Sequence, residues 1–237
     1  MNPRSPRRRC RVLCVWACAL LLMMALYPAS SLAQTDEKIK TSVDDLVHKH
    51  YMDGIPYAAA HALGPAALPY LFELLGNPEE KLFWVNIIVT TGFLENSSAI
   101  DPLVAFLENT QGEVDSFTFR ALLSVPYALG CIAANQGDAK AFQYLADNLE
   151  TPLNQTVRWS YRSKPVDELI AEQSVMGLAV SGQPEARILL LDLKDKIAKK
   201  TDPKSHALSY GNIGQALAII DRIATEGRSA VLNPQRE

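Results

Sequence analysis

The stretch from Gly64 to Gly76, GPAALPYLFELLG, contains the pattern that decides the fold. After the Gly-Pro turn, Leu68, Leu71 and Leu75 are spaced i, i+3 and i+7, which places them along one face of a helix. Three more triplets follow turn signals: Ile100, Leu103 and Leu107; Phe142, Leu145 and Leu149; Ala186, Leu189 and Leu193. The triplets begin at residues 68, 100, 142 and 186, hence 32, 42 and 44 residues apart. A period in this range is typical of stacked helix pairs and predicts an α-solenoid.

The segments between the triplets also have helical patterns. Capping and breaking residues place helices over residues 82–94, 115–135, 165–181 and 205–225, with a kink expected at Pro126. The β-branched residues of 82–89 would also suit a strand, but the capping signal and the length to Leu94 favour a helix there. The predicted fold class is therefore all-α. We interpret the triplets themselves as core rather than as functional residues.

Two segments carry a resemblance to a known family. Ala60-His61-Ala62-Leu63-Gly64, with the leucine triplet after it, and Tyr127–Ala133, preceded by Phe119-Arg120, are similar to the helix pairs of the HEAT-repeat family in its short bacterial form. The resemblance covers about Ile55 to Ala198. It implies a right-handed α-solenoid of HEAT-like helical hairpins, a family whose members mostly bind proteins. It transfers no catalytic residue, and it implies a structural role between repeats for Arg120.

The N-terminal 33 residues have the order of a secretory signal peptide. Five arginines precede an unbroken apolar run of 16 residues, Val12 to Tyr27, and Ser31-Leu32-Ala33 offers a cleavage site. We therefore predict a signal peptide at 1–33, a single solenoid domain at 34–227 and a flexible tail at 228–237, in a periplasmic or secreted protein. An uncleaved Val12–Tyr27 segment that anchors the protein in the membrane is the alternative, although this run is shorter than the ~20 residues of a membrane span.

Cleavage changes the charge and the cysteine content of the chain. Five of the 23 Lys and Arg residues lie in the signal, which leaves 18 against 26 acidic residues, a formal charge of −8. This excess of acid argues against nucleic acid as a partner and, after cleavage, against an anionic membrane surface. Cys131 is then the single cysteine, and its small apolar surroundings predict a buried thiol rather than a nucleophile.

The sequence offers no convincing active site. His48 and His50 would diverge by about 200° on a helix and so could not bind one ion together. Asp44 and His48 could share a helix face, but two ligands do not make a metal site. We predict no metal, no cofactor and no catalytic residue. An enzyme or enzyme subunit with a concave groove lined by acids and His61 stays open as an alternative.

The best candidate for binding is the interruption at 151–163. Arg158, Trp159, Tyr161 and Arg162 combine aromatic rings with guanidinium groups, which are enriched in interface hot spots. Two interpretations stay open, because Trp159 and Tyr161 could instead fill the gap left by an irregular repeat. The leading hypothesis is an exported scaffold that binds a protein or peptide. The sequence does not predict the partner's identity or the oligomeric state.

Overall fold

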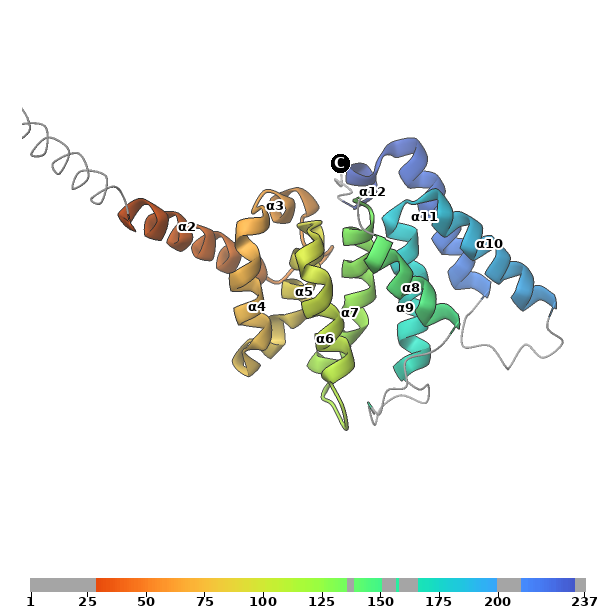
Figure 1. Ribbon diagram of the computed structural model, residues 1–237, viewed down its shortest axis with the longest axis horizontal. Helices are drawn as coiled ribbons and strands as arrows, with labels where there is room; N and C mark the ends of the chain where they lie inside the picture. Colours follow the sequence, from red (N-terminus) through yellow and green to blue (C-terminus); the bar gives the residue numbers. More distant parts are fainter. Residues whose placement is uncertain (1–28, 136–138, 151–156, 158–165, 200–209, 233–237) are drawn as a thin grey trace, which may run out of the picture. The chain divides into compact units, whose positions relative to one another are not determined.

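The computed structural model describes residues 29–135, 139–150, 157, 166–199 and 210–232 (Figure 1). Within these ranges the chain is helical and contains no strand, which confirms the all-α prediction. The chain divides into two compact units, Met1–Thr41 and Ser42–Glu237. Helix α2 (Ala29–Val47) begins in the first unit and ends in the second, and it runs through the predicted cleavage site at Ala33.

The remaining helices all belong to the second unit. In chain order they are α3 (Tyr57–His61), η1 (Pro65–Ala67), α4 (Leu68–Gly76), η2 (Pro78–Phe83), α5 (Trp84–Phe93), η3 (Ser97–Ala99), α6 (Ile100–Asn109), α7 (Ser116–Ala133), α8 (Ala139–Glu150), α9 (Val166–Ser181), α10 (Pro184–Lys199), α11 (Tyr210–Glu226) and α12 (Arg228–Leu232). Short polar side chains start several of them. Asp115 accepts a hydrogen bond from the Thr118 amide at 2.8 Å, and Asn77 and Asn96 cap η2 and η3 in the same way.

The helices of the second unit pack as two layers. The four helices with the triplets, α4, α6, α8 and α10, form the first layer, and each packs against the helix that follows it. Those partners, α5, α7, α9 and α11, form the second layer, in which each helix packs against the next (Figure 1). The most extensive packing in the molecule is between α5 and α7 and between α7 and α9.

Small residues allow the second-layer helices to approach this closely. A Cβ atom added at Gly130 in α7 would collide with the backbone of Gly177 in α9, and one at Gly177 would collide with the carbonyl of Pro126. A Cβ at Gly92 in α5 would lie 2.6 Å from the Cα of Ala128. Glycine is therefore required at these crossings because the facing backbones occupy the space of a side chain.

The four triplets are not equally buried. All residues of the α4 and α6 triplets are buried, as the core interpretation predicts. Of the α8 triplet only Leu145 is fully buried. In α10, Ala186 and Leu190 are buried while Leu189 and Leu193 are partly exposed. The interpretation of these last two triplets as core is therefore only partly correct, because α10 turns Leu190 rather than Leu189 toward the packed side.

The carboxyl ends of α5, α7 and α9 meet around one arginine. Arg228 donates to the carbonyls of Cys131 (3.0 Å) and Val180 (3.1 Å) in the last turns of α7 and α9, and it forms an ion pair with Glu95, just after α5. Glu95 also accepts a hydrogen bond from Tyr57 at 2.6 Å. We call this group the Arg228 clasp. Its geometry requires α5, α7 and α9 to run parallel, and its cation faces the negative ends of their dipoles.

The clasp corrects one prediction about the end of the chain. We predicted a flexible tail at 228–237, but Arg228–Leu232 form the helix α12, which packs against α11 and α3. The arginine side chain is only 15% exposed, so this segment is part of the packed unit. Arg228 and the partly buried Leu232 hold the segment, and a periodicity analysis of five residues cannot detect such contacts.

One described helix has the length and apolar composition of a membrane span. This helix is α7, Ser116–Ala133. It is also the central helix of the second layer, and most of it is buried against other helices. A buried core helix meets the same criteria, so this feature is weak support for a membrane-spanning segment.

Candidate functional site

The residues that the sequence nominated for binding lie outside the described part of the chain. These residues are Arg158, Trp159, Tyr161 and Arg162, in the connection between α8 and α9. The single described residue of that connection is Val157, whose side chain is buried. Both interpretations of Trp159 and Tyr161, as binding residues or as core, therefore stay predictions.

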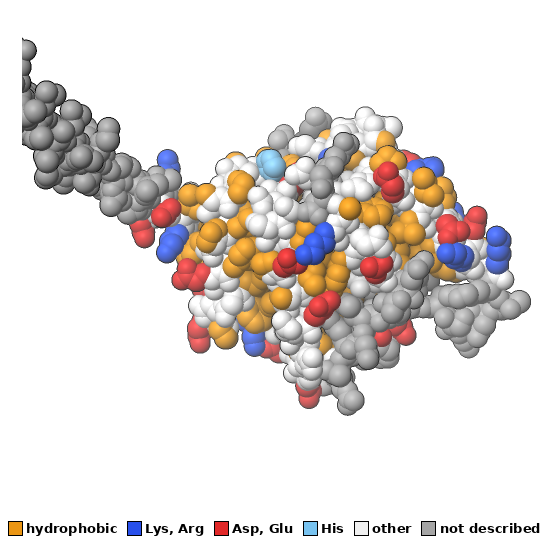
Figure 2. All heavy atoms as spheres, viewed as in Figure 1, with side chains coloured by type: hydrophobic (Ala, Val, Ile, Leu, Met, Phe, Trp, Pro, Cys, Tyr) orange, Lys and Arg blue, Asp and Glu red, His pale blue; other side chains and the backbone are white. Residues whose placement is uncertain are grey.

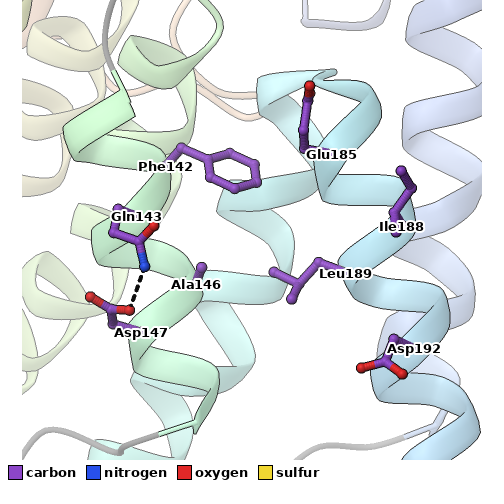
Figure 3. Close-up of a pocket in the computed structure, with 8 residues that line it drawn as sticks. All are labelled: Phe142, Gln143, Ala146, Asp147, Glu185, Ile188, Leu189 and Asp192. Carbon is purple, nitrogen blue, oxygen red and sulfur yellow. Dashed lines mark hydrogen bonds between the residues drawn. The ribbon is translucent and has the colours of Figure 1, made fainter.

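Within the described residues, a groove lies between α8 and α10. Phe142 and Ala146 line it from α8, and Ile188 and Leu189 line it from α10. Phe142 and Leu189 point toward each other across the gap, and the groove encloses about 500 Å³ (Figure 3). Helix α9 packs against both walls. Because α8 and α10 are not in extensive contact with each other, their apolar side chains face an open space.

The apolar wall formed by α10 is unusually exposed. Ile188 is 69% exposed, and Leu191, three residues later and beside the groove lining, is 37% exposed. In Figure 2, hydrophobic side chains and carboxylates are interspersed on the face that carries α8 and α10. Single exposed apolar residues are common, but a cluster with a polar border marks an interaction surface.

Carboxylates border this groove on both helices. Asp147 on α8 accepts a hydrogen bond from Gln143 at 2.7 Å, and Asp192 on α10 pairs with Lys196 at 2.7 Å (Figure 3). Glu185, in the first turn of α10, has no ion-pair partner among the described residues. No Lys, Arg or His lines the described groove. An apolar floor with a negative border favours a ligand that has apolar and cationic groups side by side.

The described histidines take separate local roles. His48 Nε2 lies 2.7 Å from a Glu80 carboxylate oxygen, whereas His61 Nδ1 lies 2.9 Å from the carbonyl oxygen of Phe93. The His61 ring also stacks on Tyr57, with centroids 5.5 Å apart. His61 therefore lies on α3, beside the Arg228 clasp. The alternative of a groove lined by acids and His61 stays a prediction. Among the described residues, no three His, Cys, Asp or Glu side chains group as metal ligands would.

Cys131 is buried, as its sequence surroundings predict. Burial raises the pKa of its thiol to about 12, because a thiolate would lose its hydration there. A thiol with such a pKa remains protonated near neutral pH. Cys131 thus packs in the second layer as a small apolar side chain.

Sequence reasoning missed the groove although one signal for it was present. Ile188-Leu189-Leu190-Leu191 are four consecutive apolar residues in a helix, and four neighbours cannot share one face. Only Leu190 of the four is fully buried, and the other three are directed to the groove or to solvent. A run of this kind on an otherwise charged helix predicts a second apolar face.

No protein-family model, no curated protein and no solved structure matches this chain.

Proposed function

We propose that this protein is an exported scaffold, a right-handed α-solenoid of HEAT-like hairpins, which binds a protein or peptide partner. The repeated pairing supports this proposal, because each triplet helix packs against the next helix in four successive pairs. Such arrays build extended surfaces from many similar units, and binding is their usual role. The signal-like N-terminal segment supports export to the periplasm or the cell exterior.

The groove between α8 and α10 is the observation that carries the binding proposal. Its exposed apolar residue Ile188 and half-buried Phe142 and Leu189 form a surface that has no partner among the described residues. A volume of about 500 Å³ accommodates a few side chains rather than a whole helix. The partner we propose is an amphipathic segment that inserts apolar anchors between the walls, as in helix-in-groove recognition.

The border of the groove sets the charge of that segment. Asp147, Glu185 and Asp192 surround the apolar wall, so basic residues beside the anchors would complement it. We therefore expect a cationic amphipathic segment rather than an acidic one. These surface charges contribute mainly to specificity and association rate, and the buried anchors contribute most of the affinity.

A pair of synthetic helical peptides tests this proposal on the full-length protein. One peptide alternates leucines and lysines at helical spacing, and the other has the same pattern with glutamates in place of the lysines. The lysine peptide should bind, in a fluorescence-anisotropy titration, at least tenfold more tightly than the glutamate peptide. Equal binding of the two, or no binding of either, would contradict the proposed groove chemistry.

Two variants locate the binding to the groove. Ile188→Ser removes the exposed anchor contact. Met52→Ser removes an even more exposed apolar side chain elsewhere, since Met52 is fully exposed and does not line the groove. Only Ile188→Ser should weaken binding of the lysine peptide. An equal loss in both variants would indicate general stickiness of apolar surface rather than a site.

Trp159 provides a separate test of the connection between α8 and α9. We propose that Arg158, Trp159, Tyr161 and Arg162 contact a part of the same protein partner other than its cationic segment, because two arginines would repel that segment. Trp159→Ala should then weaken partner binding and change thermal unfolding little. A large loss of stability with unchanged binding would assign Trp159 to the core instead.

A further inference from the structure

A second, smaller pocket has the opposite charge from the groove. It lies where the loop after α2 meets the start of α5 and the first turns of α7, and it encloses about 290 Å³. Its lining includes Lys49, His50 and Arg120, and it contains no acidic side chain. This composition is unusual in a chain whose acidic residues outnumber its basic ones.

The loop that forms one wall is held in place by Asn86. The Asn86 side-chain amide donates to the carbonyl of Val47 at 2.8 Å and to that of Lys49 at 3.0 Å. Tyr51 adds a hydrogen bond from its hydroxyl to the carbonyl of Leu46 at 2.9 Å. These bonds hold the backbone of Leu46, Val47 and Lys49 before His50 and the side chain of Tyr51 after it, so the wall is preformed.

Apolar side chains form the other walls and remain accessible. Leu82 is 51% exposed and Phe117 is 42% exposed, and both line the pocket. Phe83 also lines the pocket, and its ring centroid lies 6.2 Å from that of His50. The pocket therefore offers an apolar contact surface next to its cations.

The two permanent cations of this pocket are Lys49 and Arg120. Among the described residues, neither Lys49 nor Arg120 forms an ion pair or a side-chain hydrogen bond, and both are exposed. The nearby acids already have partners, since Asp115 pairs with Lys81 at 2.9 Å and Glu80 lies against His48. The expectation that Arg120 is a structural element between repeats is wrong here, because its side chain faces solvent and the pocket.

The direction of the second-layer helices adds to the positive potential. The Arg228 clasp lies at the carboxyl ends of α5 and α7, so the pocket is at their amino ends, where helix dipoles are positive. The amino end of α7 is already capped by Asp115, and this interaction lowers the pKa of that carboxyl group. The side chains of Lys49 and Arg120 are therefore the groups available to a ligand.

We propose that this pocket binds the free carboxyl end of a peptide whose last residue is apolar. The carboxylate would lie against Lys49 and Arg120, and the last side chain would lie against Leu82 and Phe117. A volume of about 290 Å³ suits one terminal residue and is too small for a helix. Terminal carboxylate capture is an established mode of peptide recognition, and guanidinium and ammonium groups both bind carboxylates. This site is independent of the groove proposed for the basic segment.

Three probes test the proposal by calorimetric titration into the full-length protein. The first is a tetrapeptide, acetyl-Ala-Ala-Ala-Phe, with a free carboxyl end; the second is the same peptide as its carboxamide; and the third is acetyl-phenylalanine alone. We expect the acid to bind at least fivefold more tightly than the amide, and more tightly than the single residue. Affinity for the acid should fall as salt rises, because the paired charges are exposed.

Exposed residues allow the cations to be removed without disturbing the fold. Lys49→Gln and Arg120→Gln should each lower the affinity for the free-acid peptide by up to about fivefold and leave the affinity for the carboxamide unchanged. Lys140→Gln and Arg222→Gln change the net charge equally at exposed ion pairs outside the pocket, and they should have no effect.

Several results would overturn the proposal. Equal affinity for acid and amide, or no binding of either, would remove the carboxylate site. Equal affinity for acetyl-phenylalanine and the tetrapeptide would assign the pocket to small apolar carboxylates instead of peptide ends. An equal loss of affinity in the control variants would show that binding depends on the net charge of the protein and not on this pocket. None of these results would affect binding of the lysine peptide, so the two proposals can fail separately.

Discussion

The triplets of α4 and α6 and those of α8 and α10 share one sequence pattern but have different environments. In α4 and α6 the pattern is core, and Leu71, Leu103 and Leu107 have no exposed surface. In α8 and α10 the same pattern borders an open groove, with Phe142 and Leu189 facing each other across it. A hydrophobic stripe therefore specifies which face of a helix is apolar, but not whether protein or a ligand covers that face.

The first and largest prediction tests this difference directly. Leu103→Ala removes a fully buried side chain from α6 and should lower the free energy of unfolding by about 2–5 kcal/mol. Leu189→Ala, at the equivalent triplet position in α10, should lower it by about 1 kcal/mol or less, because Leu189 is already partly exposed. Urea unfolding of both variants measures the two values. Similar losses would mean that the groove is closed in solution.

The second prediction concerns the connection between the two regions through the Arg228 clasp. Arg228→Met removes the donor to the carbonyls of Cys131 and Val180. It also leaves the Glu95 carboxylate, which keeps its hydrogen bond from Tyr57, without a cation, in a site where both charged side chains are less than one-fifth exposed. We expect a loss of about 3 kcal/mol, since one partner of a largely buried ion pair is then uncompensated.

Two further variants show whether this loss comes from the clasp. Arg222→Met changes an exposed arginine of α11 and should leave unfolding unchanged. The double variant Arg228→Met with Glu95→Gln should recover part of the loss, because no uncompensated charge remains. Additive losses in a double-mutant cycle would show that Arg228 and Glu95 do not interact.

Much of the fold could be predicted from the sequence because local patterns determine it. The helical spacing of Leu68, Leu71 and Leu75, and the capping residues Asn77 and Asp115, are local signals, and each corresponds to a helix or a helix start in the structure. The buried Cys131 follows from its small apolar neighbours in the same way.

The groove, the pocket and the clasp depend on contacts between distant parts of the chain. Arg228 interacts with Glu95 across 133 positions, and no local pattern distinguishes it from any other charged residue near a chain end. Arg120 and Lys49 line one pocket only because α7 packs beside α5 and because Asn86 positions the loop. Burial of a given side chain is a tertiary property, whereas periodicity reports only the face on which it lies.

The third prediction uses the buried thiol of the second layer to test packing around α7. Burial raises the pKa of Cys131 from 9.0 to about 12, so the folded state keeps a proton that the unfolded chain releases. Stability from this group is fully present below pH 9 and is lost as the pH rises toward 12, by up to about 1.4 kcal/mol per pH unit.

Unfolding in urea at pH 7, 9, 10 and 11 measures this loss, and Cys131→Ala should reduce its slope. For each variant, the free energy of unfolding at pH 7 serves as the reference. The packing that Cys131→Ala removes lowers this energy at every pH, so only the change from pH 7 reports titration of the thiol. An unchanged slope would mean that the thiol is accessible to water in solution. Leu189→Ala should retain the wild-type slope, since Leu189 lines the groove and not the second layer.

The smallest predicted effect separates the two roles that a charge at the groove could have. Glu185 lies in the first turn of α10, where a carboxylate is favoured by the helix dipole, and it also borders the groove. Glu185→Gln should lower the free energy of unfolding by about 0.3–1 kcal/mol through the dipole alone.

If the groove binds a cationic segment, the same variant should also lower the affinity for the lysine peptide by a few-fold and reduce the salt dependence of its binding. Glu168→Gln, in the first turn of α9 and outside the groove, should show the dipole effect without the binding effect. Equal peptide affinity in both variants would show that Glu185 stabilises α10 but does not contribute to binding. Selection of a basic partner by the described groove would then depend on Asp147 and Asp192.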